Sequence, residues 1–274
     1  MLFRFLILSM LFISSLTADA LTTKIKNLVG EKQYYKHKNL VDTLFQKKSN
    51  FYTVKGNLRY EDILKVLRNN GLLHLKFKKP KEVKIEFTTN ENPIKSLKIL
   101  NDTLRDMGYY YYFTKSNMFN KDQQAMVWTI VFNAEYAVDP LLFTQELKKR
   151  HCYVMDIDKQ SSNFWKYSLD MEFANIKDIT RISKNEKVVL HKPLKPYFIE
   201  VDYAISVEII STRLNRWFPY IVCFDKDLNV LKVIKEKNVH KKYKINLPKN
   251  TKYIKIADLY NLINIKRGLS VIVR

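Results

Sequence analysis

Segments with apolar residues at helical spacing alternate along the chain with segments in which apolar and polar residues alternate as in a strand. This order restricts the fold more than any other feature of the sequence. Apolar side chains recur at helical spacing between residues 60 and 70, which predicts an α-helix with one apolar face. Gly71 ends that helix, because glycine readily adopts the left-handed conformation of a C-terminal cap. Residues 72–77 then alternate apolar and polar side chains, as a half-buried strand does. Residues 78–81, with a central proline, are predicted to turn the chain.

The same helix–glycine–strand unit occurs a second time. Pro93 stands in the first turn of the second helix, where its missing N–H costs no hydrogen bond. Gly108 ends this helix before a predicted strand over residues 109–113. Further strands over residues 51–54 and 83–87 complete a β-α-β-β-α-β order, in which both helices cover one face of a sheet.

This order resembles the short N-terminal domain shared by secretins and TonB-dependent receptors. The resemblance is carried by two segments over residues 51–120, Val66-Leu67-Arg68-Asn69-Asn70-Gly71-Leu72-Leu73 and Leu104-Arg105-Asp106-Met107-Gly108-Tyr109. It implies a periplasmic adaptor domain that docks onto other proteins or assembles into rings. No secretin pore domain or receptor barrel follows, so secretion and receptor activity are not implied. The overall layout is also similar to that of periplasmic proteins of Campylobacter-like bacteria.

The remaining chain divides into three regions. Residues 21–50 are predicted to form a basic helical arm with a break at Gly30. Residues 121–196 read as a second α+β module followed by a linker-like stretch from residue 174, which contains two prolines. Residues 197–274 contain several short strand candidates separated by turn signals, which predicts an all-β sandwich. The predicted fold class is therefore α+β, with two small α+β modules followed by a C-terminal sandwich.

Composition excludes a disordered chain but leaves the meaning of its charge open. Hydrophobic residues make up 46% of the sequence and aromatic residues 13%, enough to bury a core. The formal net charge is +21. Such a charge attracts anionic lipid, acidic polysaccharide or nucleic acid. Lys outnumbers Arg and accompanies many Asn, Ile, Tyr and Phe residues, which share A/T-rich codons, so codon bias is the alternative explanation.

The N-terminus has the features of a cleaved export signal. Arg4 provides the positive start, and a short apolar run over residues 5–16 follows it. Ala18-Asp19-Ala20 fits the small-x-small cleavage pattern of a signal peptidase. The apolar run is shorter than the roughly 20 residues that span a bilayer. We therefore expect a periplasmic protein whose residues 1–20 are a signal peptide.

The sequence offers no convincing catalytic or metal-binding pattern. Asp225, Asp227 and Asn229 alternate as calcium ligands do, but the glycine and distal glutamate of an EF-hand loop are missing, which favours a hairpin turn. His151 and Cys152 are adjacent on a predicted strand and would point to opposite faces. No zinc spacing and no glycine-rich phosphate loop is present. We expect no enzymatic activity, no cofactor and no metal.

The two cysteines allow two states. Cys152 and Cys223 both lie in apolar, strand-like segments, which favours buried free thiols. An oxidising compartment would also permit a disulfide between them.

Two aromatic groups are candidates for partner binding. In the run 109–113, Tyr110 and Tyr112 would share the strand face turned away from the helices, where they meet either a partner or a neighbouring domain. The second group joins aromatic rings to arginines near the start of the sandwich, although a core position is the alternative for its tryptophan. Its members are Arg213, Arg216, Trp217 and Tyr220.

These observations favour a non-catalytic adaptor or structural protein of the cell envelope, with other envelope proteins as partners. The alternative is an envelope glycan or anionic-polymer binding protein that uses the C-terminal sandwich. A peripheral contact with anionic envelope surfaces is compatible with both. An exported protein is not expected to bind nucleic acid. The sequence makes no prediction of the oligomeric state.

Overall fold

The computed structural model describes residues 20–120, 125–177 and 179–274. The chain divides into two compact units between Asn175 and Ile176, and the mixed α+β class with a strand-rich C-terminal part is confirmed. The predicted signal peptide lies outside the described residues except for Ala20. None of the helices in the described ranges has the length and apolar character that a membrane crossing requires.

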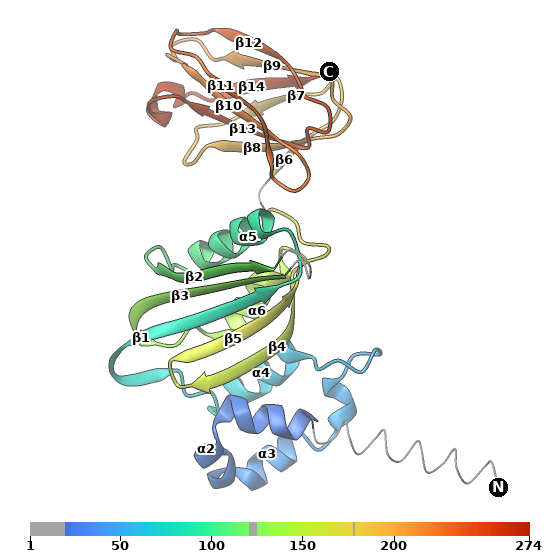
Figure 1. The fold of residues 1–274 in the computed structure, drawn as a ribbon, viewed down its shortest axis with the longest axis vertical. Helices are drawn as coiled ribbons and strands as arrows, with labels where there is room; N and C mark the ends of the chain where they lie inside the picture. The colour runs from blue at the N-terminus through green and yellow to red at the C-terminus, as the bar shows by residue number, and fades with distance from the viewer. Residues whose placement is uncertain (1–19, 121–124, 178) are drawn as a thin grey trace, which may run out of the picture. The chain divides into compact units, whose positions relative to one another are not determined.

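The N-terminal unit is built on one five-stranded sheet in the order β2-β3-β1-β5-β4 (Figure 1). β1 is paired in parallel with β5, and the other neighbours in the sheet are antiparallel. The strands are β1 (Lys76–Thr89), β2 (Phe113–Asn120), β3 (Ala125–Tyr136), β4 (Tyr153–Ser161) and β5 (Phe164–Asp170).

The strands predicted for two separate modules therefore share one sheet, which corrects the modular arrangement. The two strands expected on either side of the turn at 78–81 are one continuous strand, β1. Pro80 falls between the paired residues Lys76 and Lys81, where the register with β3 shifts. An irregular part of a strand tolerates proline, since no ladder hydrogen bond depends on its missing N–H. β1 pairs on both sides, with β3 and with β5, and so joins the modules.

Three helices with apolar faces pack on one side of this sheet: α4 (Tyr60–Asn69), α5 (Pro93–Asp106) and α6 (Pro140–Lys148). The side chains of Asn92 and Asp139 accept hydrogen bonds from the first N–H groups of α5 and α6. Between helices and sheet, the rings of Phe87, Phe143 and Tyr167 lie within 4.9–6.0 Å of each other. The helices predicted to end at Gly71 and Gly108 are confirmed as α4 and α5.

The N-terminal arm is helical, as predicted, but it is divided more finely. It consists of a helix over residues 20–29 (the 20–29 helix), α2 (Glu31–Lys36), α3 (Lys38–Leu44) and the short η1 (Lys48–Phe51). The break at Gly30 is present, with φ of 90°. The strand predicted over residues 51–54 does not form; only an isolated bridge joins Tyr52 to Leu58.

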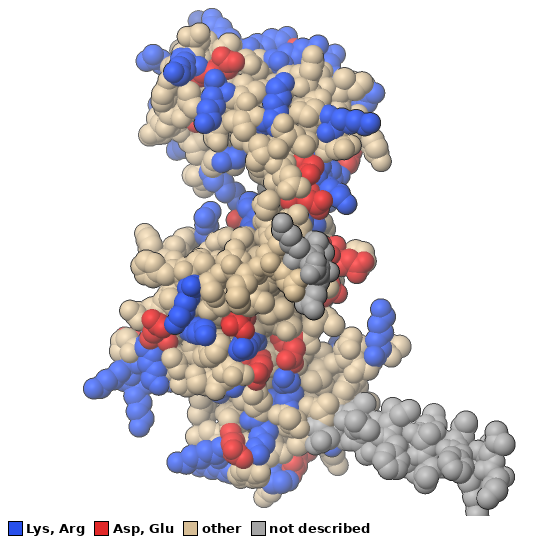
Figure 2. Space-filling model, in the orientation of Figure 1, with Lys and Arg blue, Asp and Glu red and all other residues tan. Residues whose placement is uncertain are grey.

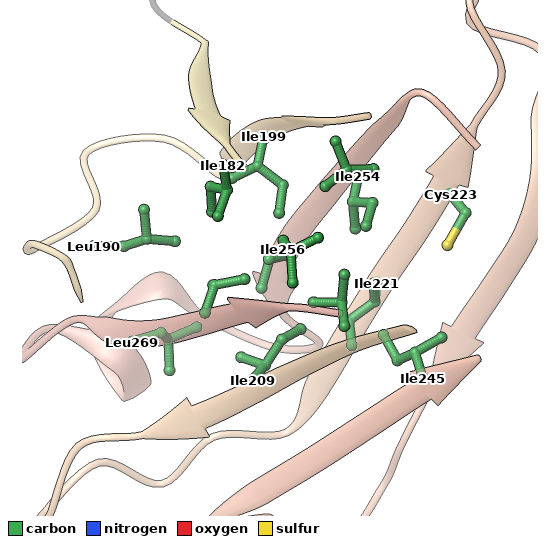
Figure 3. Close-up of a cluster of buried hydrophobic side chains, with 14 of the residues drawn as sticks. Ile182, Leu190, Ile199, Ile209, Ile221, Cys223, Ile245, Ile254, Ile256 and Leu269 are labelled. Carbon is green, nitrogen blue, oxygen red and sulfur yellow. The ribbon is translucent and has the colours of Figure 1, made fainter. Parts of the chain in front are cut away.

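The C-terminal unit is a sandwich of two sheets whose inner faces share one apolar core. A five-stranded sheet has the order β11-β10-β13-β8-β6, and a four-stranded sheet has the order β12-β9-β14-β7. Figure 3 shows isoleucine side chains from both sheets interleaved in this core. The strands are β6 (Thr180–Ile182), β7 (Lys187–Leu190), β8 (Tyr197–Val201), β9 (Ser206–Ser211), β10 (Pro219–Phe224), β11 (Val230–Lys235), β12 (Lys242–Asn246), β13 (Tyr253–Asp258) and β14 (Leu269–Val273); a short helix, η2 (Leu262–Ile265), precedes β14.

The stretch predicted as a linker belongs to this sandwich. It contains β6 and β7, which place Ile182 and Leu190 in the shared core (Figure 3). Pro193 and Pro196 mark the connection between β7 and β8 rather than a domain boundary. The strands were hidden from sequence reasoning because β6 has three residues and β7 four, too few to show a periodicity.

Candidate functional site

The two edge strands of the N-terminal sheet differ in whether another element covers their backbone. At the β4 edge, the 20–29 helix covers the strand. Lys24 Nζ donates to the carbonyl of Ile157 at 3.1 Å. Asn27 accepts from the N–H of Lys159 at 2.9 Å and donates to its carbonyl at 3.3 Å. Side chains of the helix thus satisfy backbone groups that an open edge would offer to another strand.

The opposite edge, β2, is the last strand of the sheet order and is paired only with β3 among the described residues. It contains eight residues and no proline. Its one lysine, Lys115, lies where the register with β3 shifts. Natural proteins commonly protect such an edge with charges, proline or a covering segment. β2 carries little of this protection.

The apolar side chains on β2 are exposed. The exposed fraction is 77% for Phe113 and 61% for Met118. Phe113 pairs with Val131 and Met118 with Val127, and cross-strand partners share one face of a sheet. These four residues, which we call the β2 strip, lie on the face opposite the helices, because the adjacent Trp128 of β3 faces the core. Figure 2 shows mainly uncharged surface over this part of the sheet.

Of the strand predicted over residues 109–113, only Phe113 lies in a strand, and this changes the role of the tyrosines before it. β2 begins only at Phe113. The ring of Tyr112 packs edge-on against Trp128 at 5.9 Å, and its hydroxyl donates to Asn101. Burial raises the pKa of Tyr112, so its phenol stays neutral at physiological pH. Tyr112 is therefore half-buried and packs on the helix side of the sheet, and its role in partner binding stays a prediction.

Of the predicted pair, Tyr110 alone is largely open, with 65% of its side chain exposed. Sequence reasoning missed Tyr111, which is 92% exposed, and the β2 strip. The cap after α5 sets this outcome: the N–H of Tyr109 bonds to the carbonyl of Leu104, which delays the start of the strand. Apolar and polar side chains do not alternate regularly over residues 113–117, so no clear strand pattern marked the start of β2.

The second predicted group is not one site. Trp217 is fully buried, and its Nε1 donates to the carbonyl of Ala257 at 2.9 Å. It therefore occupies a core position, which was the alternative to a partner-binding role. Arg213 and Arg216 are exposed in the loop that precedes β10. Tyr220 lies on β10 with a side chain turned to the outer face of the sheet.

Tyr220 has cations on both sides. Lys235 Nζ lies 5.8 Å and Lys255 Nζ 5.6 Å from the centre of its ring. Figure 2 shows more Lys and Arg than Asp and Glu on the visible face of this unit. A half-exposed ring between two ammonium groups offers both a stacking surface and positive charge.

The cysteines and the Asp225 turn, weighed above for chemistry, have the following surroundings in the structure. Within the described ranges, no three His, Cys, Asp or Glu side chains are placed to hold a metal ion. Burial raises the pKa of the Cys152 thiol to about 12 and also raises that of Cys223, so neither is an activated nucleophile. Both cysteines are buried and free. Asp225 accepts from the N–H groups of Asp227 and Asn229, as in a side-chain-stabilised turn.

The chain matches no protein-family model and none of the curated proteins. The resemblance to the secretin and TonB-receptor domain stays a prediction.

Proposed function

We propose that this protein is a non-catalytic adaptor of the cell envelope that binds an extended segment of a partner protein along β2. The supporting observation is the difference between the two sheet edges. The 20–29 helix occupies the β4 edge with side-chain hydrogen bonds, whereas the described residues leave β2 as an uncovered terminal strand. The export signal read from residues 1–20 supports a periplasmic location.

The chemistry of such binding is strand addition. An incoming strand forms main-chain hydrogen bonds with the outer edge of β2, and these supply much of the affinity. Specificity comes from side-chain contacts on alternate residues. The β2 strip offers Phe113 and Met118 to apolar side chains of the partner segment. We therefore expect the partner segment to be extended, apolar at alternate positions and free of proline.

The proposal is tested by placing a photo-crosslinking amino acid at Phe119, which is 39% exposed on β2, and irradiating cells that make the protein. We expect cross-links to one defined segment of an envelope protein. Met118→Lys introduces a charge into the β2 strip and should abolish them.

Met155→Lys is the matched control, since Met155 lies on the covered edge strand β4 with 46% exposure. This variant should leave the cross-links unchanged. Equal loss in both variants, or cross-links scattered over unrelated proteins, would refute the adaptor function.

A second candidate function, glycan binding by the sandwich, is favoured by Tyr220 and its two lysines. Isothermal titration of the chain with soluble peptidoglycan fragments provides the test. Binding that Tyr220→Ala removes and Tyr220→Phe retains would support stacking on a sugar ring. An absence of heat at all concentrations would exclude this candidate.

A further inference from the structure

One end of the C-terminal sandwich is formed by two loops that lie side by side, residues 212–218 and residues 259–268. The N–H of Arg216 donates to the carbonyl of Asn264 at 3.0 Å. The hydroxyl of Thr212 donates to the carbonyl of Gly268 at 2.9 Å. The first loop leads into β10, and the second follows β13 and contains η2. We call this surface the η2 end.

Large apolar side chains project from the η2 end into solvent. The exposed fraction is 73% for Leu214, 67% for Ile263 and 64% for Tyr260. Single exposed apolar residues are common on soluble proteins. Here, however, three belong to adjoining loops at one end of a domain. An apolar phase that covered them would recover the free energy lost by their exposure to water.

The loops that carry these side chains are tightly held. Leu214 has φ of 74°, a left-handed conformation that is unfavourable for leucine. Its neighbour Asn215 donates to the carbonyl of Gly268 at 2.8 Å and accepts from the N–H of Arg267 at 3.2 Å. The fold thus fixes Leu214 in an outward position despite the conformational cost, instead of letting it fold back onto the core.

A buried carboxylate fixes the second loop. Asp258 is 6% exposed and accepts, at 2.9 Å each, from the N–H groups of Tyr260 and Asn261 and from the side-chain amide of Asn264. It also accepts from the N–H of Phe218 at 2.8 Å, which ties the two loops together. The apolar side chains therefore stand on a rigid base.

The exposed charges within the two loops are all of one sign. The two loops contain four exposed cations and no Asp or Glu. The nearby carboxylate of Asp258, which precedes the second loop, is buried. The positive charge at this end therefore has no carboxylate within the loops to neutralise it. The cations are Arg213, Arg216, Lys266 and Arg267.

We propose that the η2 end docks onto the surface of an anionic lipid bilayer. Leu214 and Ile263 enter the boundary between headgroups and acyl chains, and the surrounding cations contact lipid phosphates. Lipid is the ligand that matches both features at once. A glycan could stack on the ring of Tyr260 but would leave the branched aliphatic side chains of Leu214 and Ile263 exposed to water. This inference goes beyond the adaptor function and uses a surface in the other unit of the chain.

The test measures co-sedimentation of residues 21–274 with phosphatidylcholine vesicles that contain or lack phosphatidylglycerol. The predicted leader is omitted because its apolar run would itself bind lipid. We expect binding to the anionic vesicles that weakens as salt is added. Substituting Gln for Arg213 and Arg216 together should reduce partitioning about thirtyfold, since each cation near an anionic surface contributes about fivefold.

The charge-matched control substitutes Gln for Lys226 and Lys249. These residues lie in the turns next to Phe224, at the other end of β10, as the bond from the N–H of Lys252 to the carbonyl of Phe224 shows. The control lowers the net charge equally and should leave the dependence on anionic lipid nearly unchanged.

Leu214→Asn separates membrane contact from folding. Asparagine tolerates a positive φ better than leucine, so the variant should be at least as stable as the parent. It should nevertheless bind the anionic vesicles about five- to tenfold more weakly, because one apolar anchor is lost. Ile263→Asn should weaken binding to a similar extent.

Three results would overturn the proposal. The first is equal binding to vesicles with and without phosphatidylglycerol. The second is equal loss of binding in the Arg213/Arg216 and Lys226/Lys249 variants. The third is binding to soluble polygalacturonate that exceeds binding to the vesicles and survives Leu214→Asn, which would assign the η2 end to an anionic glycan.

Discussion

Replacing Gly268 with alanine is expected to damage the sandwich through a steric clash with its own backbone. Gly268 has φ of 83° and directly precedes β14. A Cβ atom placed there would lie 2.1 Å from the carbonyl oxygen of Leu190 on β7, where real contacts stay beyond 3.0 Å. The obstacle is backbone and cannot rotate away, so β7 and β14 must separate by about 1 Å.

The size of the effect follows from two contributions. An alanine with a positive φ costs about 1–2 kcal/mol. Separation of the strands disturbs the ladder beside the paired residues Leu269 and Leu190, and two weakened hydrogen bonds cost about 1 kcal/mol each. We therefore expect Gly268→Ala to lower the free energy of unfolding of the C-terminal unit by about 3–4 kcal/mol.

Gly71→Ala is the matched control. Gly71 also has a positive φ, 68°, but nothing lies within 4 Å of a Cβ atom built there. Gly71→Ala should lower the free energy of unfolding of the N-terminal unit by only the conformational contribution, about 1–2 kcal/mol. Hydrogen exchange read by mass spectrometry reports each unit separately, which a single unfolding transition of a two-unit chain does not. Equal losses for the two alanines would refute the clash.

Three further results are expected. Asp106→Asn should cost the N-terminal unit about 2–3 kcal/mol in urea unfolding, because the 2%-exposed guanidinium of Arg150 loses the nearer of its two carboxylates, at 2.5 Å, and keeps only Glu146 at 3.9 Å; Arg150→Met in the same chain should recover part of the loss. Cys152 should resist iodoacetamide at neutral pH until denaturant is added, since burial raises its pKa to about 12; rapid labelling of the folded chain would contradict its burial. The hydrogen bond from Lys148, at 2.6 Å, lowers the pKa of Glu61, so this pair stabilises the fold above the ordinary glutamate pKa and loses that contribution as pH falls through the lowered value. The contribution should stay under about 1 kcal/mol at this exposed site, and Glu61→Gln should remove that part of the acid dependence of urea unfolding.

The candidate site shows which features depend on residues close together in the sequence and which depend on residues far apart. The aromatic run 109–113 was visible in the sequence, and so was its value to a partner. Which of its rings are exposed depends on where β2 begins, and the cap after α5 decides that. Trp217 illustrates the same division: its neighbours suggested a surface, but its indole meets the carbonyl of Ala257, a residue forty positions away.

The openness of β2 was beyond sequence reasoning for a related reason. An edge strand and a central strand can have the same sequence pattern, since the difference lies in whether a second strand pairs with them. Here the 20–29 helix covers β4 through Lys24 and Asn27, contacts that join residues more than one hundred positions apart. No local signal in residues 113–120 could show that β2 would lack such a cover.

The sequence by itself determined the fold class and the ends of the helices that carry capping signals. Pro93, Gly71 and Gly108 placed helix ends, because caps and glycine conformations depend on near neighbours along the chain. Tertiary structure alone decided that β1 joins the expected modules into one sheet and that residues 180–190 complete the sandwich. Strand pairing is a contact between distant segments, and its free energy depends on which surfaces meet in space rather than on the order of residues in any one segment.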